Sequence, residues 1–205
     1  MYRILILFHS SGHNVASMAQ QVARGVDAVA DCEAIIKTVA PVSTTTRASE
    51  AAVPASGPPF ATLEDLNQCD GLLLGSPTHF GNMSAAMKHF IDGSTASWMS
   101  AALTGKPAGV FTSTGSMHGG QESTLLSMML PLLHHGMVMV GLPYSEPALA
   151  RTSRGGTPYG ASHVSGANGN DPLDDDEKLL CRALGQRVAE CALALKGSAL
   201  QRTPG

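Results

Sequence analysis

Residues 71–84 read GLLLGSPTHFGNMS, and this stretch decides the fold. Its first part is an apolar run that stops at Gly75 and turns at Pro77, as a short buried strand does. A polar loop follows, and a helix is expected to begin near Ser84. A strand that is apolar at every position lies in a sheet covered on both faces, where ligands bind beyond the carboxyl ends of the strands. The loop 76–83 is therefore the first candidate wall of a ligand site.

The same strand-loop-helix unit is repeated along the chain. Apolar runs predict further strands over residues 4–8, 32–39, 108–112 and 137–140. Helical spacing of apolar residues follows most of them, and in the helix predicted over 122–134 we expect Leu125, Leu126, Met129, Leu132 and Leu133 to face the core. Five β-α units predict an α/β fold with a parallel sheet covered by helices.

The domain organisation follows from length and local composition. At 205 residues the chain fits one domain, expected over 1–197. Residues 41–62 are rich in Ala, Ser, Thr and Pro, and residues 143–171 are rich in Gly; both are interpreted as irregular flap insertions. Residues 198–205 are expected to be a tail.

Three loops made of small, hydroxyl-bearing and glycine residues each follow a predicted strand: 9–14, 76–83 and 113–122. A parallel sheet brings its carboxyl-end loops to one edge, so the three are expected to meet. The first opens a helix, where N–H groups and the helix dipole can bind a phosphate. An ordinary turn capped by serine and asparagine is the alternative interpretation of that segment.

Charge and cysteine usage exclude several classes of function. The formal net charge of −3 gives no general attraction to nucleic acid or to an anionic membrane. The four cysteines form no CxxC pair, and no apolar run approaches 18 residues, so a cytoplasmic protein with reduced thiols is expected. No metal is expected: His9 and His13 lack a third ligand, and the acidic residues 174–177 are interpreted as a helix start.

Four motifs, taken together in this order and spacing, are highly specific: residues 76–83, 113–122, 134–137 and 154–161. Through them the chain resembles the WrbA family of flavodoxin-like NAD(P)H:quinone oxidoreductases (type IV, FMN-dependent) over nearly its whole length. The resemblance implies a three-layer sandwich with strand order 2-1-3-4-5. It also implies a homotetramer whose active site is shared between subunits.

The resemblance implies the following site residues. Those for FMN are Ser10, Ser11, Gly12, His13, Asn14, Val15, Pro77, Thr78, His79, Phe80, Ser113, Thr114, Gly115, Ser116, His118, Gly119, Gly120 and His134. His134 is also implied as the catalytic residue. The alternative is that His134 is only a helix-end histidine that interacts with the C-terminal dipole of its helix. Trp98 is implied to wall the substrate pocket. The chain departs from the family pattern at Gly12, His13 and His79.

The implied activity is two-electron reduction of a quinone to a hydroquinone, in a ping-pong reaction with NADH or NADPH as the hydride donor. The bound flavin supplies the redox chemistry and the protein supplies orientation. A flavodoxin-like electron carrier and an FMN-binding regulatory protein are the alternatives. Nothing in the residues indicates nucleic-acid binding, and neither the physiological quinone nor the preferred nucleotide can be determined from the sequence.

Overall fold

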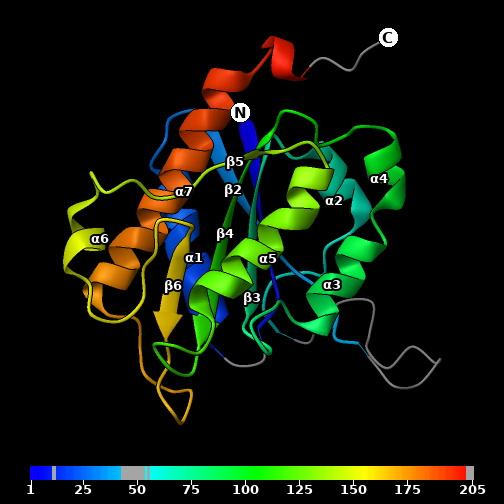
Figure 1. Cartoon of the computed structure of the whole chain (residues 1–205). Coiled ribbons are helices and arrows are strands. Elements are labelled where there is room, and N and C mark those ends of the chain that lie inside the picture. Colours follow the sequence, from blue (N-terminus) through cyan, green and yellow to red (C-terminus); the bar gives the residue numbers. More distant parts are fainter. Residues whose placement is uncertain (11–12, 43–53, 55, 202–205) are drawn as a thin grey trace.

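The computed structural model describes residues 1–10, 13–42, 54 and 56–201, and its centre is a parallel sheet (Figure 1). The strands are β1 (Tyr2–Phe8), β2 (Cys32–Thr38), β3 (Gly71–Pro77), β4 (Pro107–Thr114) and β5 (Val138–Met139). Their order is β2-β1-β3-β4-β5, and every pair is parallel. This confirms the strand order and the fold class implied by the sequence.

A sixth strand, β6 (Ala161–Val164), differs from the prediction. It pairs with the carboxyl-end half of β4, from Phe111 opposite Ala161 to Thr114 opposite Val164. β5 pairs only with Pro107 and Ala108 at the other end of β4. The segment 143–171, expected to be irregular, therefore contains both β6 and a short helix, α6 (Pro147–Arg151). The chain places two short strands in succession along one edge of β4.

Helices cover both faces of the sheet. α1 (Asn14–Asp27) and α7 (Asp175–Leu195) lie on one face, and α2 (Leu63–Gln68), α3 (Ala85–Asp92), α4 (Thr95–Met99) and α5 (Gln121–His134) lie on the other (Figure 1). Alternate residues of β1 separate accordingly: Ile4 and Ile6 pack in the core of the first face, Leu5 and Leu7 in that of the second. Residues 199–201 form a short 3-10 turn.

α1 and α7 approach each other closely through two glycines. A Cβ added at Gly25 would lie 1.9 Å from the carbonyl oxygen of Arg182, and one added at Gly185 would lie 2.1 Å from that of Val22. No larger residue fits at either position without separating the helices. The crossing fixes α1 against the long helix that spans the same face.

Helix starts agree with the sequence. Ser84 caps α3 by accepting a hydrogen bond from the N–H of Met87 at 3.3 Å. Asp174 caps α7 in a capping box with Glu177, which supports the interpretation of the acidic cluster as a helix start. None of the helices in the described ranges is long and apolar enough to span a membrane.

The inward face of α5 was predicted incorrectly in part. Leu125 and Leu132 are fully buried, as expected, but Leu126 and Leu133 are 44% and 54% exposed. Met128 instead completes the buried stripe, because residues three and four apart share a helix face. The leucines at 126, 130 and 133 form a second, outward apolar stripe.

Candidate active site

The three predicted loops meet at one cavity of about 300 Å³ at the carboxyl ends of β1, β3 and β4. Ten residues line it: Ser10, Asn14, Val15, Pro77, Thr78, Ser113, Thr114, Gly115, Ser165 and Gly169. Eight of the ten are residues singled out from the sequence. Ser165 and Gly169 follow β6 and were not anticipated.

The first turn of α1 opens toward this cavity. His13 is the N-cap residue, exposed to solvent, and its side chain makes no capping hydrogen bond. The first N–H groups of a helix have no acceptor inside the helix, and Asn14 and Val15 of this turn line the cavity. The amide of Asn14 donates to the carbonyl oxygen of Gly169 at 2.8 Å. Ser11 and Gly12, also predicted to contact the ligand, lie outside the described residues.

The second loop is joined to the third at the cavity wall. The N–H of Thr78 donates to the carbonyl oxygen of Ser113 at 3.0 Å, and its hydroxyl lies 3.0 Å from that of Thr124. His79 and Asn82 exchange two main-chain hydrogen bonds and turn the loop outward. Phe80 sits at this turn with a φ of 54°, and its side chain is fully exposed. His79 and Phe80 are thus exposed residues of the loop beyond the cavity lining.

The third loop is closed by its own hydrogen bonds. The hydroxyl of Thr114 donates to the carbonyl oxygen of Ser116 at 2.8 Å. The N–H of Gly119 donates to that same oxygen at 3.0 Å. Ser116, His118 and Gly119 are exposed, and Gly120 begins α5 with a φ of 96°. The Thr114 hydroxyl hydrogen is used in the loop, so its oxygen can serve a further partner only as an acceptor.

No charged side chain lines the cavity within the part of the chain that the structure describes. His9 lies just before Ser10, and burial, with a smaller effect of His79, lowers the pKa of its imidazole. The polar groups at the lining are hydroxyls, a carboxamide and main-chain groups. Such neutral groups beside a helix N-terminus suit a phosphate ester with a polyol chain.

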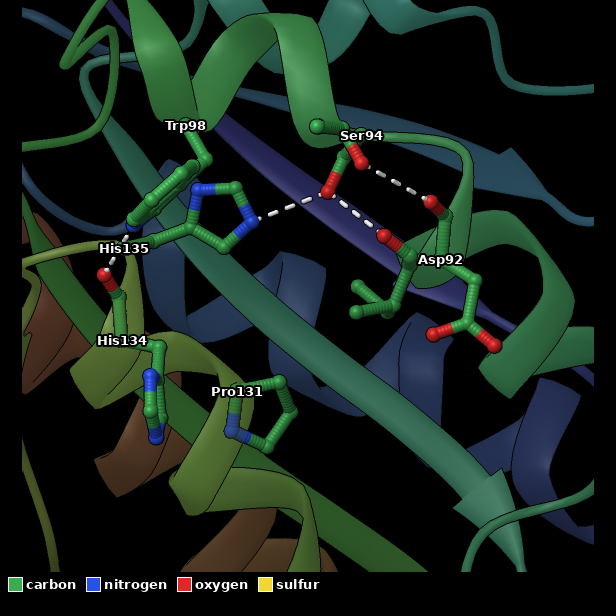
Figure 2. Close-up of a pocket in the computed structure, with 8 residues that line it drawn as sticks. Asp92, Ser94, Trp98, Pro131, His134 and His135 are labelled. Carbon is green, nitrogen blue, oxygen red and sulfur yellow. Dashed lines mark hydrogen bonds between the residues drawn. The ribbon is translucent and has the colours of Figure 1, made fainter.

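His134 and Trp98 lie elsewhere, in a second cavity of about 500 Å³ between α3, α4 and α5 (Figure 2). Its lining residues are Ile91, Asp92, Ser94, Thr95, Trp98, Pro131, His134 and His135. α5 begins at the third loop and ends at His134, and its 14 residues span roughly 20 Å at 1.5 Å per residue. The structure therefore does not bring these two residues to the three loops of their own chain.

His135 is a fixed neutral residue of the second cavity. Its Nε2 lies 2.9 Å from the Ser94 hydroxyl, which itself donates to the carbonyl oxygen of Ile91 at 2.6 Å (Figure 2). Nε2 must therefore carry the hydrogen. Burial, and secondarily His134, lowers the pKa of His135, whose Nδ1 has no partner among the described residues.

Comparison with known proteins identifies the family of the chain. The sequence model of the family described as NADPH-dependent FMN reductase matches residues 3–147. The chain belongs to the NADPH-dependent FMN reductase family. A curated relative from Solidesulfovibrio magneticus named NAD(P)H dehydrogenase (quinone) is 40% identical over 200 residues, covering 94% of this chain and 98% of the relative.

Solved structures show the same fold. A WrbA-like flavodoxin from Agrobacterium tumefaciens has a TM-score of 0.68 at 22% identity, covering 96% of this chain and all of that one. Flavodoxin 1 from Bacillus cereus has a TM-score of 0.59 at 18% identity, with 92% and 97% covered. With the curated relative, they confirm the resemblance drawn from the sequence motifs.

Two buried hydrogen-bonded side-chain pairs that involve β6 were not predicted from the sequence. Ser162 on β6 donates to the carboxamide of Gln121, and His163 on β6 contacts Glu177 at 2.9 Å. All four side chains are buried. The sequence pattern offers no sign of either pair, because the partners are 41 and 14 positions apart.

Proposed function

We propose that this protein is an FMN-dependent NAD(P)H:quinone oxidoreductase that reduces quinones to hydroquinones by a ping-pong hydride mechanism. The observation that carries the proposal is the meeting of the three loops and the start of α1, where the His13 side chain makes no capping hydrogen bond, at one neutral, hydroxyl-lined cavity. The name of the 40% identical relative supports the same reaction.

The residues present fit FMN. The first N–H groups of α1 and the loop from Ser10 would hold the phosphate, since they combine main-chain donors with the positive end of a helix dipole. Thr78, Ser113 and Ser165 would lie along the ribityl chain as hydroxyl partners. The exposed loop residues 79–80 and 115–120 would border the ring system. When bound, FMN supplies hydride acceptance from NADH or NADPH and two-electron delivery to the quinone.

We infer that the substrate side of the site is completed by another subunit. His134 and Trp98 are held together, since the indole N–H donates to the carbonyl oxygen of His134 at 2.9 Å, yet they lie a helix length from the loops. A neighbouring copy can present them to the FMN cavity. There Trp98 would wall the quinone pocket, and His134 would donate a hydrogen bond to the quinone oxygen as negative charge develops.

An exposed apolar surface on α4 and α5 supports association into a homotetramer. It consists of Trp98, Met99, Leu126, Leu130 and Leu133, which are between 44% and 72% exposed. Exposed apolar side chains gathered on neighbouring helices can mark interaction sites in proteins. A cytoplasmic location is part of the proposal, and the free thiols of all four cysteines agree with it.

The experiment that tests the function is an anaerobic stopped-flow measurement of FMN-loaded protein, mixed first with NADH or NADPH and then with benzoquinone. The flavin absorbance is expected to bleach rapidly with one nucleotide and to recover rapidly with the quinone. Flavin that binds but bleaches only with dithionite would contradict the proposal and favour an electron carrier.

A further inference from the structure

We propose that His163 is a positioning residue of the FMN cavity: a doubly protonated imidazole that holds loop 165–171 against the start of α1. The inference rests on the proposed function in that it takes the bound ligand to be FMN. It concerns a residue outside the cavity lining, fully buried between β6 and α7.

Both ring nitrogens of His163 face oxygen acceptors. Nε2 lies 3.0 Å from the carbonyl oxygen of Asp171, which carries no hydrogen, so Nε2 must donate. Nδ1 lies 2.9 Å from the Glu177 carboxyl, on Oε2. His163 therefore has two places for a hydrogen and none for an acceptor lone pair, provided that Glu177 is ionised.

Three main-chain N–H groups hold Glu177 in its ionised form. Gly155 and Val164 donate to its Oε1 at 3.1 Å each, and Asp174 donates to Oε2 at 2.9 Å. Burial alone raises the pKa of this carboxyl, but the hydrogen bonds from His163, Asp174 and Val164 outweigh it and leave the pKa below its ordinary value. The Glu177 carboxylate is thus an acceptor for His163 Nδ1 within a set of four hydrogen bonds.

The pair anchors the base of a loop that forms one wall of the cavity. Asp171 accepts from His163 through its carbonyl oxygen and donates its N–H to the carbonyl oxygen of Ser165 at 2.9 Å. On the outer side, Arg154 donates to the Asp171 carboxylate at 2.8 Å. At the tip, the carbonyl oxygen of Gly169 accepts from Asn14, the first residue of α1.

This chain of contacts runs from α7 to the cavity lining. Ser165 and Gly169 line the cavity and belong to the loop whose base His163 secures. Loss of the hydrogen bond to Asp171 would release that base, and with it the contact of Gly169 to Asn14. The consequence expected for the ligand is weaker binding, while Gln121 still holds the tip of the third loop through the carbonyl oxygen of Met117.

The test compares His163→Gln with His89→Gln, a control at an exposed position on α3. FMN affinity is measured by flavin fluorescence, and amide hydrogen exchange is followed in the ligand-free proteins. We expect the dissociation constant to rise about tenfold or more in His163→Gln. Residues 165–171 should exchange faster while the helix α5 (Gln121–His134) is unaffected, and the control should match the wild type.

A double variant, His163→Gln with Glu177→Gln, removes the charge with its partner and is used if the single variant does not fold. Nitrogen NMR of the wild-type imidazole decides the protonation state independently: both nitrogens of His163 should carry hydrogen at neutral pH. A singly protonated ring, or a folded variant with wild-type FMN affinity and wild-type exchange in 165–171, would overturn the inference. Wild-type protein that binds no FMN would refute the proposed function instead, and the exchange result would still stand.

Discussion

The indole N–H of Trp98 donates a hydrogen bond to the main-chain carbonyl of His134 across 2.9 Å. The bond joins α4 to the last residue of α5 and makes the two residues proposed for the substrate pocket one unit. That unit lies roughly 20 Å along α5 from the loop that begins the helix. An active site that uses both ends of α5 needs two copies of the chain.

Mixed oligomers test this sharing directly. His134→Ala and Thr114→Asp are each expected to have little quinone reductase activity alone, since one damages the substrate side and the other the FMN cavity. Random assembly of the two variants gives about a quarter of the sites both intact halves, so activity should return to about a quarter of the wild-type value. Activity of the co-expressed mixture is the measurement, and absence of recovery would show that no site is shared.

Charge placed on the apolar surface of α5 should reduce the oligomeric state. Leu130 is 61% exposed, and Leu130→Asp is expected to leave the fold intact while subunits separate, because a carboxylate would have to be buried at the interface. Light scattering after size exclusion measures the mass. Gln20→Asp, at an exposed position on α1, is the control and should keep the wild-type mass. A Leu130→Asp protein of unchanged mass would place the interface elsewhere.

Carboxylates in the cavity should abolish FMN retention. In the double variant Ser10→Asp with Thr114→Asp, two negative charges would face the phosphate and the ring, where the wild-type lining is neutral. The protein should purify colourless, whereas Ser17→Asp, at an exposed position on α1, should stay yellow. Full flavin occupancy in the double variant would show that the cavity is not the FMN site.

Glu177 should make stability depend on acid pH. Its pKa lies below the ordinary value of 4.5 in the folded protein, so its contribution is complete above about pH 4.5 and is lost as the pH falls through the lowered pKa. Glu177→Gln removes the carboxylate that accepts from His163 and from three main-chain N–H groups, and is expected to cost about 3 kcal/mol of unfolding free energy at neutral pH. Denaturant unfolding of the wild type and the variant, measured in steps of about one pH unit between about pH 3 and 7, tests both expectations.

Phe80 has an unfavourable backbone conformation. Its φ of 54° is costly for a large side chain, and Asn adopts this region more readily. Because the ring is fully exposed, Phe80→Asn should raise the unfolding free energy by about 0.5 to 1 kcal/mol. Tyr144→Asn, at another exposed aromatic residue, should give no such gain. Reduced stability of Phe80→Asn would mean that the aromatic ring makes contacts that compensate for its backbone.

The central strands could be predicted because β1, β3 and β4 are contiguous apolar runs, which read as buried whatever their neighbours are. The three loops of the site followed, since a parallel sheet places its carboxyl ends together. β6 could not be predicted in this way. Its residues 162 and 163 are polar, and their burial depends on Gln121 and Glu177, partners that only the folded chain brings near.

The helix faces and the position of His134 show a second limit of sequence reasoning. Leucines at 126 and 133 have the same apolar character as those at 125 and 132, so hydrophobicity alone could not distinguish the core from a surface suited to association. The distance of His134 from the loops follows from the length of α5. The family resemblance identified His134 as a site residue but did not show that it lies far from the three loops of its own chain.

The glycine crossing of α1 and α7 has a thermodynamic consequence for ligand binding. Gly25 and Gly185 let the two backbones touch, so the position of α1 is set by a close contact in its C-terminal half, away from the first turn at the cavity. The orientation of its first turn exists before any ligand arrives. Association then loses little conformational entropy in this helix, and more of the interaction free energy appears as affinity.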